Sequence, residues 1–389
     1  MKSFLEILHN LFRTIKRFPL PILAGCVAFV CIVCEIHFGR TGELLIHDYR
    51  YVKMFLECAS GISLFLACDL FSEAHQVERS RRIGLYMLSF CILGLHYFQI
   101  TPGMFDSETV FLSRYLIFVV CFHALVSFVV FYKSDQVIPF WQYNYFLLKR
   151  ITTSLLYSFS LFAGLTSAMF ALDKLFSIHI PSDYYLDLLA FIVLIFNTIF
   201  FLKGFPLTYT SFSQNKEFKK SIRLFVQYVL LPILVMYITI LYLYMIKILV
   251  EQQLPNGWVC IPIIVFSILG ILAYLLVYPI RLQEENRIIK VYAHYFFYIL
   301  LPLLSLYFIA VYKRIMPYGI TEDRYLLVVL GIWLVVISIY IITSKRDNII
   351  VIPVSLFVLL SLSAVGPWGM FQLSTENQLD RLERLLKRN

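Results

Sequence analysis

The sequence predicts an all-α protein, a polytopic integral membrane helical bundle with about 11 transmembrane helices. Three observations lead to this fold class. Of the 389 residues, 60% are hydrophobic and only 15% are charged, whereas roughly a quarter of the residues in soluble domains are charged. Long apolar runs recur along the whole chain with short polar connections between them. Aromatic residues make up 17% of the chain, which suits helices whose ends lie among lipid headgroups.

The apolar runs give the predicted helices in order, since a spanning helix needs about 20 mostly apolar residues. By residue number they are 20–36, 51–71, 83–100, 110–132, 151–172, 185–202, 224–250, 259–277, 292–312, 325–342 and 349–365. The connections between them are too short for an inserted soluble domain. An odd number of crossings would leave the two ends of the chain on opposite sides of the membrane.

Lysine and arginine alternate from one connection to the next. Most of the 33 basic residues lie in the N-terminal segment and in every second connection after it. Because cytoplasmic loops are enriched in lysine and arginine, the N-terminus is predicted to be cytoplasmic and the C-terminus periplasmic. Basic residues scattered between apolar runs do not form the soluble basic face of a nucleic-acid binder, so no nucleic-acid partner is expected despite the net charge of +9.

Three regions are predicted along the chain. Residues 1–18 form an interfacial amphipathic helix on the inner membrane surface, because apolar residues recur at helical spacing away from the basic ones. That stripe consists of Phe4, Leu8, Leu11, Ile15 and Phe18. Residues 19–367 form the transmembrane helical domain. Residues 368–389 form a periplasmic amphipathic tail, whose helix would start at a capping box of Thr375 and Gln378.

Within the transmembrane domain, residues 218–290 and 291–349 resemble two copies of a parallel two-helix unit. The segment from Tyr228 to Pro232 recurs at residues 298–302, and a Leu-Gly-Ile triplet recurs at Gly270 and Gly331. Duplicated units are common in membrane transport folds. Convergence of leucine-rich sequence explains the match equally well, so both interpretations stand.

Ionisable side chains inside a bilayer are costly, which makes each one a functional candidate. Glu35, His37, Glu57 and His96 fall in the outer third of the predicted membrane, and His123 lies deeper. They predict a polar cavity open to the outside, with Glu57 as its leading residue. The alternative is that Glu35, His37 and His96 simply extend to the outer headgroups.

The most distinctive outer connection covers residues 314–325, where a proline and a glycine make a turn. Thr321 is expected to cap the next helix, and Glu322 and Asp323 favour its positive end. Arg324 enters the outer membrane surface and is a candidate contact for a carboxylate or a lipid phosphate. These four residues are the predicted outer-loop contact site.

No catalytic residue, cofactor site or metal site is predicted. The chain has no P-loop, no HExxH and no GxSxG sequence. Cys31 and Cys34 have CxxC spacing without the second pair that a structural zinc site needs. Asp69, at the inner end of the second span, is expected to extend its carboxylate to the membrane surface.

Two segments carry a family resemblance. Residues 318–325 followed by Trp333, together with residues 364–374, resemble a bacterial polytopic membrane family catalogued as domain of unknown function 4153. The resemblance implies a multi-pass protein of the bacterial inner (cytoplasmic) membrane, and it implies no reaction, cofactor or ligand. Members of that family continue into a soluble C-terminal portion, so we expect residues 368–389 to be the start of a truncated or shortened tail.

The leading hypothesis for function is a non-catalytic envelope scaffold or partner-binding platform. Its expected partners are membrane lipids and, through the C-terminal tail, a periplasmic or envelope protein. The first alternative is a transporter of a small solute or lipid, favoured by the repeat and by the outer polar residues. The second alternative is a membrane transferase acting on a lipid-linked substrate, with Arg324 holding its phosphate.

Overall fold

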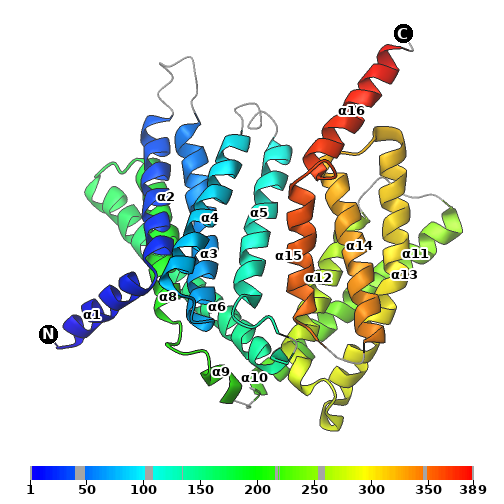
Figure 1. Ribbon diagram of the computed structural model, residues 1–389, viewed down its shortest axis with the longest axis horizontal. Helices are drawn as coiled ribbons and strands as arrows, with labels where there is room; N and C mark the ends of the chain where they lie inside the picture. Colours follow the sequence, from blue (N-terminus) through cyan, green and yellow to red (C-terminus); the bar gives the residue numbers. More distant parts are fainter. Residues whose placement is uncertain are drawn as a thin grey trace. The chain divides into compact units, whose positions relative to one another are not determined.

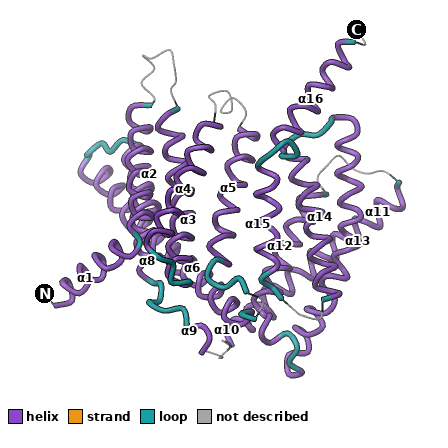
Figure 2. Tube along the Cα trace, viewed as in Figure 1, coloured by secondary structure: helices purple, strands orange, loops and turns teal. Residues whose placement is uncertain are grey.

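Helices joined by short turns and loops make up the part of the chain that the computed structural model describes. The described residues are 2–39, 49–100, 108–133, 135–214, 218, 220–252, 259–344 and 348–387. Within them the segments between helices are turns and loops, and no strand is present (Figure 2). The all-α prediction is therefore confirmed.

The first of two compact units comprises Met1–Phe111, Phe118–Tyr132 and Gln142–Phe212. Its helices are α1 (Lys2–Arg17), α2 (Pro19–Phe38), α3 (Arg50–Ala74), α4 (Arg79–Gln99), most of α5 (Glu108–Phe128) and of α6 (Val137–Phe176), α7 (Ser182–Phe191), the π-helical turn η2 (Ile192–Phe196) and α8 (Asn197–Lys203). The short helix α9 (Ser211–Gln214) falls at the boundary of this unit.

The second unit comprises Leu112–Ile117, Lys133–Trp141 and Ser213–Asn389. Its helices are α10 (Lys220–Phe225), the π-helical turn η3 (Val226–Leu230), α11 (Leu231–Glu251), α12 (Cys260–Val277), the 3₁₀ turns η4 (Tyr278–Ile280) and η5 (Glu284–Asn286), α13 (Arg287–Tyr318), α14 (Glu322–Thr343), α15 (Val351–Ala364) and α16 (Met370–Leu386).

Eight helices of the described chain are long and apolar enough to cross a membrane. They are Pro19–Phe38, Arg50–Ala74, Val137–Phe176, Ser182–Lys203, Lys220–Glu251, Cys260–Ile280, Glu284–Tyr318 and Glu322–Thr343. The three remaining predicted spans fall on α4, α5 and α15, and the last two of these contain shorter apolar helices, Tyr115–Phe128 and Val351–Ala364. The protein is thus an all-helical membrane protein with eight candidate spans.

Helix α3 is the most enclosed candidate span, packed between α2 and α4 (Figure 1). Small residues on its buried face allow this close packing, as is usual where membrane helices meet. A Cβ added to Gly61 would lie 3.2 Å from the Leu93 side chain of α4. On α2, a Cβ at Gly25 would lie 2.6 Å from the carbonyl oxygen of Leu194, so that helix touches the backbone of η2 directly.

Helix α13 is the centre of the second unit, with α12 and α14 packed against it (Figure 1). The two glycines of the sequence repeat both accommodate its rings. A Cβ at Gly270 of α12 would overlap the Phe296 ring, and one at Gly331 of α14 would lie 2.6 Å from the Tyr307 ring. Tyr292 also donates a hydrogen bond to the carbonyl oxygen of Gly270. The internal repeat itself stays a prediction.

Candidate functional site

Of the five residues predicted to line an outer polar cavity, the structure brings Glu57 and His96 into contact. Oε1 of Glu57 lies 2.5 Å from Nδ1 of His96, and the imidazole ring packs 4.0 Å from the ring of Phe118. Glu57 and His96 are only 4% and 6% exposed, so the pair lies inside the packing of α3 against α4. Oε2 of Glu57 is buried and accepts no hydrogen bond from a described residue. The contact between the two side chains is therefore shielded from bulk water.

The other three predicted cavity residues make separate contacts. His37 lies at the end of α2, where its Nε2 is 2.7 Å from Oδ2 of Asp187 on α7. Nδ1 of His123 lies 2.8 Å from the carbonyl oxygen of Val119 in its own helix. Glu35 is half-buried near the C-terminal end of α2. The described residues contain no group of three or more His, Cys, Asp and Glu side chains that could hold a metal ion.

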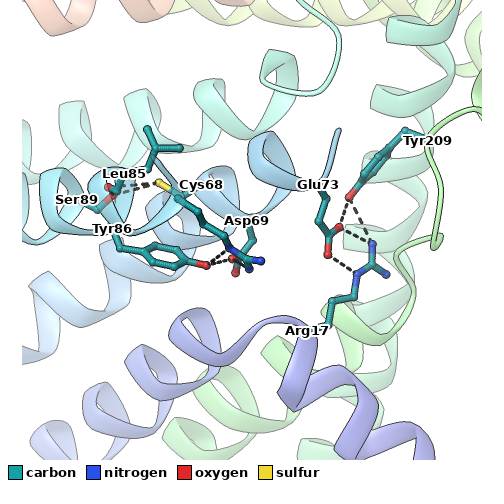
Figure 3. Close-up of polar contacts among 9 residues, drawn as sticks. Arg17, Cys68, Asp69, Glu73, Leu85, Tyr86, Ser89 and Tyr209 are labelled. Carbon is teal, nitrogen blue, oxygen red and sulfur yellow. Dashed lines mark hydrogen bonds and ion pairs between the residues drawn. The ribbon is translucent and has the colours of Figure 1, made fainter. Parts of the chain in front are cut away.

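A polar cluster that the sequence interpretation missed lies at the other end of α3 (Figure 3). Asp69 is completely buried, and its Oδ1 lies 2.6 Å from Nη2 of Arg82. The hydroxyl of Tyr86 donates to the same oxygen and accepts a hydrogen bond from Nε of Arg82. The expectation that Asp69 extends to the membrane surface is therefore wrong. Arg82 and Tyr86 lie one turn apart on α4, so both face Asp69 across the antiparallel helix pair.

A second cluster joins three segments beside the end of α3 (Figure 3). The guanidinium of Arg17, at the end of α1, forms two hydrogen bonds of 2.8 and 2.7 Å with the two carboxylate oxygens of Glu73. Arg17 also donates to the carbonyl oxygens of Phe205 and Pro206. Burial and the Glu73 carboxylate raise the pKa of Tyr209, so its hydroxyl stays protonated and donates to Glu73. Arg17 thereby ties α1 to the core of the first unit.

In the second unit, the predicted outer-loop residues lie on the turn between α13 and α14. Thr321 is the N-cap residue of α14, although its side chain makes no capping hydrogen bond. Glu322 is buried and Asp323 is exposed. Nη1 of Arg324 donates to the carbonyl oxygen of Gly319 at 2.6 Å and to that of Tyr318 at 3.0 Å. Arg324 therefore holds the turn in shape.

The C-terminal helix α16 is fastened to the same turn. Oδ1 of Asn377 accepts a hydrogen bond from the Ile320 amide, and Nε2 of Gln378 donates to the Ile320 carbonyl oxygen. Tyr325, in the first turn of α14, donates to the carbonyl oxygen of Trp368 just before α16. The two segments that carry the family resemblance thus contact each other, which their separation in sequence did not reveal.

The predicted start of this tail helix is wrong. Helix α16 begins at Met370, directly after Gly369, so Thr375 and Gln378 lie inside it. The Thr375 hydroxyl donates to the carbonyl oxygen of Phe371 within the same helix. A capping box needs its threonine at the helix boundary. The boundary lies five residues before Thr375, because the turn at residues 365–369 is followed directly by helix.

A cavity of about 400 Å³ lies between the end of α13 and α16. Its wall is apolar on one side and basic on the other. Among the lining residues are Ile315, Pro317, Ile320, Arg381, Arg384 and Leu385. Arg381 also lies over the ring of Tyr318, 5.9 Å from its centroid. Sequence reasoning missed both arginines, although their three-residue spacing on an amphipathic helix places them on one face.

These features define a multi-spanning, all-helical membrane protein with buried polar clusters and a pocket formed by its C-terminal helix. The chain matches the family described as Domain of unknown function (DUF4153) over residues 22–386, and it belongs to that family. The family predicted from the two sequence segments is confirmed.

The chain also matches a curated bacterial protein over part of its length. The chain is similar to uncharacterized protein PM1469 of Pasteurella multocida (strain Pm70), with 29% identity over 198 residues. That alignment covers 51% of this chain and 33% of the relative, so the matched part of this chain spans about a third of the relative's length. No solved structure matches the chain.

Proposed function

We propose that this chain is a non-catalytic platform of the bacterial inner membrane that holds α16 out to a partner protein. In this proposal about eleven spans cross the membrane, with residues 1–18 on the cytoplasmic surface and residues 368–389 in the periplasm. The alternation of basic connections supports this orientation. Epitope tags at the two ends should be detected on opposite faces of the membrane, and detection of both from one side of intact spheroplasts would overturn the topology.

The observation that supports the proposal is that α16 is bound to the rest of the protein on one face and exposes apolar side chains on another. One face is fastened to the turn before α14 through Asn377 and Gln378. Leu379, Leu382 and Leu386 form a stripe on the opposite face, with 55%, 53% and 68% of their surface exposed. A helix held on one face, with apolar residues at positions i, i+3 and i+7 on the other, is suited to bind an apolar groove.

The charges beside this leucine stripe indicate the chemistry of the partner. Glu376, Asp380 and Glu383 are all exposed and follow one edge of the stripe. Opposite charges at the rim of an interface guide encounter and fix register. The partner is therefore an envelope protein with an apolar groove and a basic rim.

A photo-crosslinking amino acid at Leu382 tests the platform in cells that express the full chain. We expect a discrete protein adduct from Leu382, and none from the same probe at Arg384 on the opposite face of α16. Adding Leu379→Glu should abolish the Leu382 adduct, because it places a charge in the apolar contact. Adducts of equal yield from both probe positions, or an adduct that survives Leu379→Glu, would contradict a partner on this face.

A transporter is the second candidate, and the buried contact of Glu57 with His96 favours it. A carboxylate that is shielded from water and keeps one unpaired oxygen is costly in a membrane, and ionisable groups that are kept there despite this cost commonly mark proton or solute pathways. Glu57→Gln keeps the shape and removes the titration, so it should abolish proton-coupled flux in vesicles while the protein still purifies as a folded species. Glu78→Gln, at an exposed position before α4, is the control. Unchanged flux in Glu57→Gln would remove this candidate.

A further inference from the structure

Positive charge is concentrated around the cavity at the end of α13. Arg381 and Arg384 line it. The charges of Arg314 and Arg381 lie close enough to Arg324 to oppose its charge, and Asp323 compensates for them in part. Within the described part of the chain, Arg314, Arg381 and Arg384 make no ion pair. Like charges gathered beside a partly enclosed space raise the free energy of the protein, and a bound anion relieves that cost.

The arrangement of Arg381 and Arg384 suits a phosphate group. They lie at positions i and i+3 of α16, so they share the face that is turned toward the cavity. The planar fork of a guanidinium matches phosphate oxygens with two parallel hydrogen bonds, and a phosphate can accept from two arginines at once. Arg324 is occupied by the carbonyl oxygens of the turn, so it acts as a positioning residue for this site.

The rest of the wall suits the organic part of such a ligand. Ile315 and Pro317 present apolar surface on the α13 side of the cavity, and Leu385 adds apolar surface beside the arginines on α16. A cavity of about 400 Å³ is within the usual size of pockets that hold small ligands. One side of this cavity can therefore bind an anion while the other shields carbon atoms from water.

The place of the cavity beside the turn between two candidate spans also suits a lipid phosphate. The candidate spans Glu284–Tyr318 and Glu322–Thr343 end and begin on either side of the turn that borders it. The junction of two consecutive spans lies at the boundary between hydrocarbon and water, where the headgroups are.

We propose that this cavity binds a phosphate ester, with the phosphate held by Arg381 and Arg384 and the organic substituent against Ile315, Pro317 and Leu385. The proposal goes beyond the platform role, since it requires no partner protein and concerns the opposite face of α16. Two sources could supply this chemistry: a phospholipid headgroup or a water-soluble phosphate ester.

Calorimetric titration of the purified full chain in a neutral detergent separates these sources. The probes are dihexanoyl phosphatidic acid, which carries short acyl chains, and glycerol 3-phosphate, which carries none. We expect at least one probe to bind, with affinity lowered by about tenfold or more in Arg381→Gln/Arg384→Gln, because charge-assisted hydrogen bonds are lost. Preference for dihexanoyl phosphatidic acid assigns the site to a lipid, and equal affinities assign it to a soluble ester.

The control is the double substitution Arg79→Gln/Arg81→Gln, which removes the same charge from exposed positions at the start of α4 and should leave binding unchanged. If the α16 double variant does not fold, Arg384→Gln alone is the test, because the Arg384 side chain is exposed and hydrogen-bonds within its own helix. The proposal is wrong if neither probe binds, or if the folded α16 variant binds as tightly as the unaltered chain.

Discussion

Arg82→Ala is expected to destabilise the protein by about 3 kcal/mol, the lower end of the cost of removing one partner from a buried ion pair, because Asp69 is fully buried while the Arg82 side chain is 32% exposed. The reason is the position of Asp69, which has no exposed surface and accepts its charged hydrogen bond from Arg82. Without that guanidinium the carboxylate keeps the Tyr86 hydroxyl as its remaining donor. Unfolding by denaturant in detergent, followed by helix content, measures the loss.

Two further variants separate this effect from a general effect of losing charge. Asp69→Asn/Arg82→Gln removes both charges, and we expect it to recover much of the stability that Arg82→Ala loses, because no unpaired buried charge remains. Arg81→Ala alters the exposed neighbouring residue and should change stability by less than about 0.5 kcal/mol. Equal losses for Arg81→Ala and Arg82→Ala would show that the Asp69 contact contributes little.

The helices could be predicted from the sequence because crossing a bilayer is a local requirement. About 20 apolar residues in a row are sufficient, and every predicted span coincides with helix in the structure. The contact of Glu57 with His96 could be predicted in part for the same reason, since the sequence places both residues at one depth on neighbouring antiparallel helices. The depth of a residue in the membrane follows from its position along the helix. Its contact partner depends on which face of the helix is turned toward the neighbouring helices, and the sequence does not show this.

The clusters at the C-terminal end of α3 could not be predicted, because they depend on how the helix is rotated and on segments that are distant in the sequence. Asp69 lies near a span end, where an extended carboxylate is the usual outcome, and only the packing against α4 turns it inward. Glu73 lies 56 residues from Arg17 and 136 residues from Tyr209 along the chain. Hydropathy carries no information about such pairings, since each residue on its own resembles an ordinary surface charge or loop tyrosine.

The contact between the turn before α14 and helix α16 gives a physical meaning to the two segments that resemble the family. Gly319 has φ 72° and ψ −176°, a backbone region that is nearly restricted to glycine. A Cβ there would lie 2.6 Å from Oδ1 of Asn377, the atom that accepts the Ile320 amide hydrogen bond. The turn and the helix are therefore one structural unit. Together they form the arginine-lined cavity, and α16 carries the exposed leucine stripe on its other face.

Gly319→Ala is expected to detach α16 from the turn and to cost about 1–3 kcal/mol, the range for a residue held in a disfavoured backbone region. Hydrogen–deuterium exchange should show rapid exchange across residues 370–386 and unchanged protection in α3 and α4. Gly84→Ala is the matched control, because an added Cβ there meets nothing within 4 Å. If α16 is protected from exchange as strongly as in the unaltered chain, this helix does not depend on the turn.

Detachment of α16 should also weaken the Leu382 adduct and phosphate binding together, because both the leucine stripe and Arg381 lie on α16. Leu379→Glu, in contrast, should weaken the adduct alone.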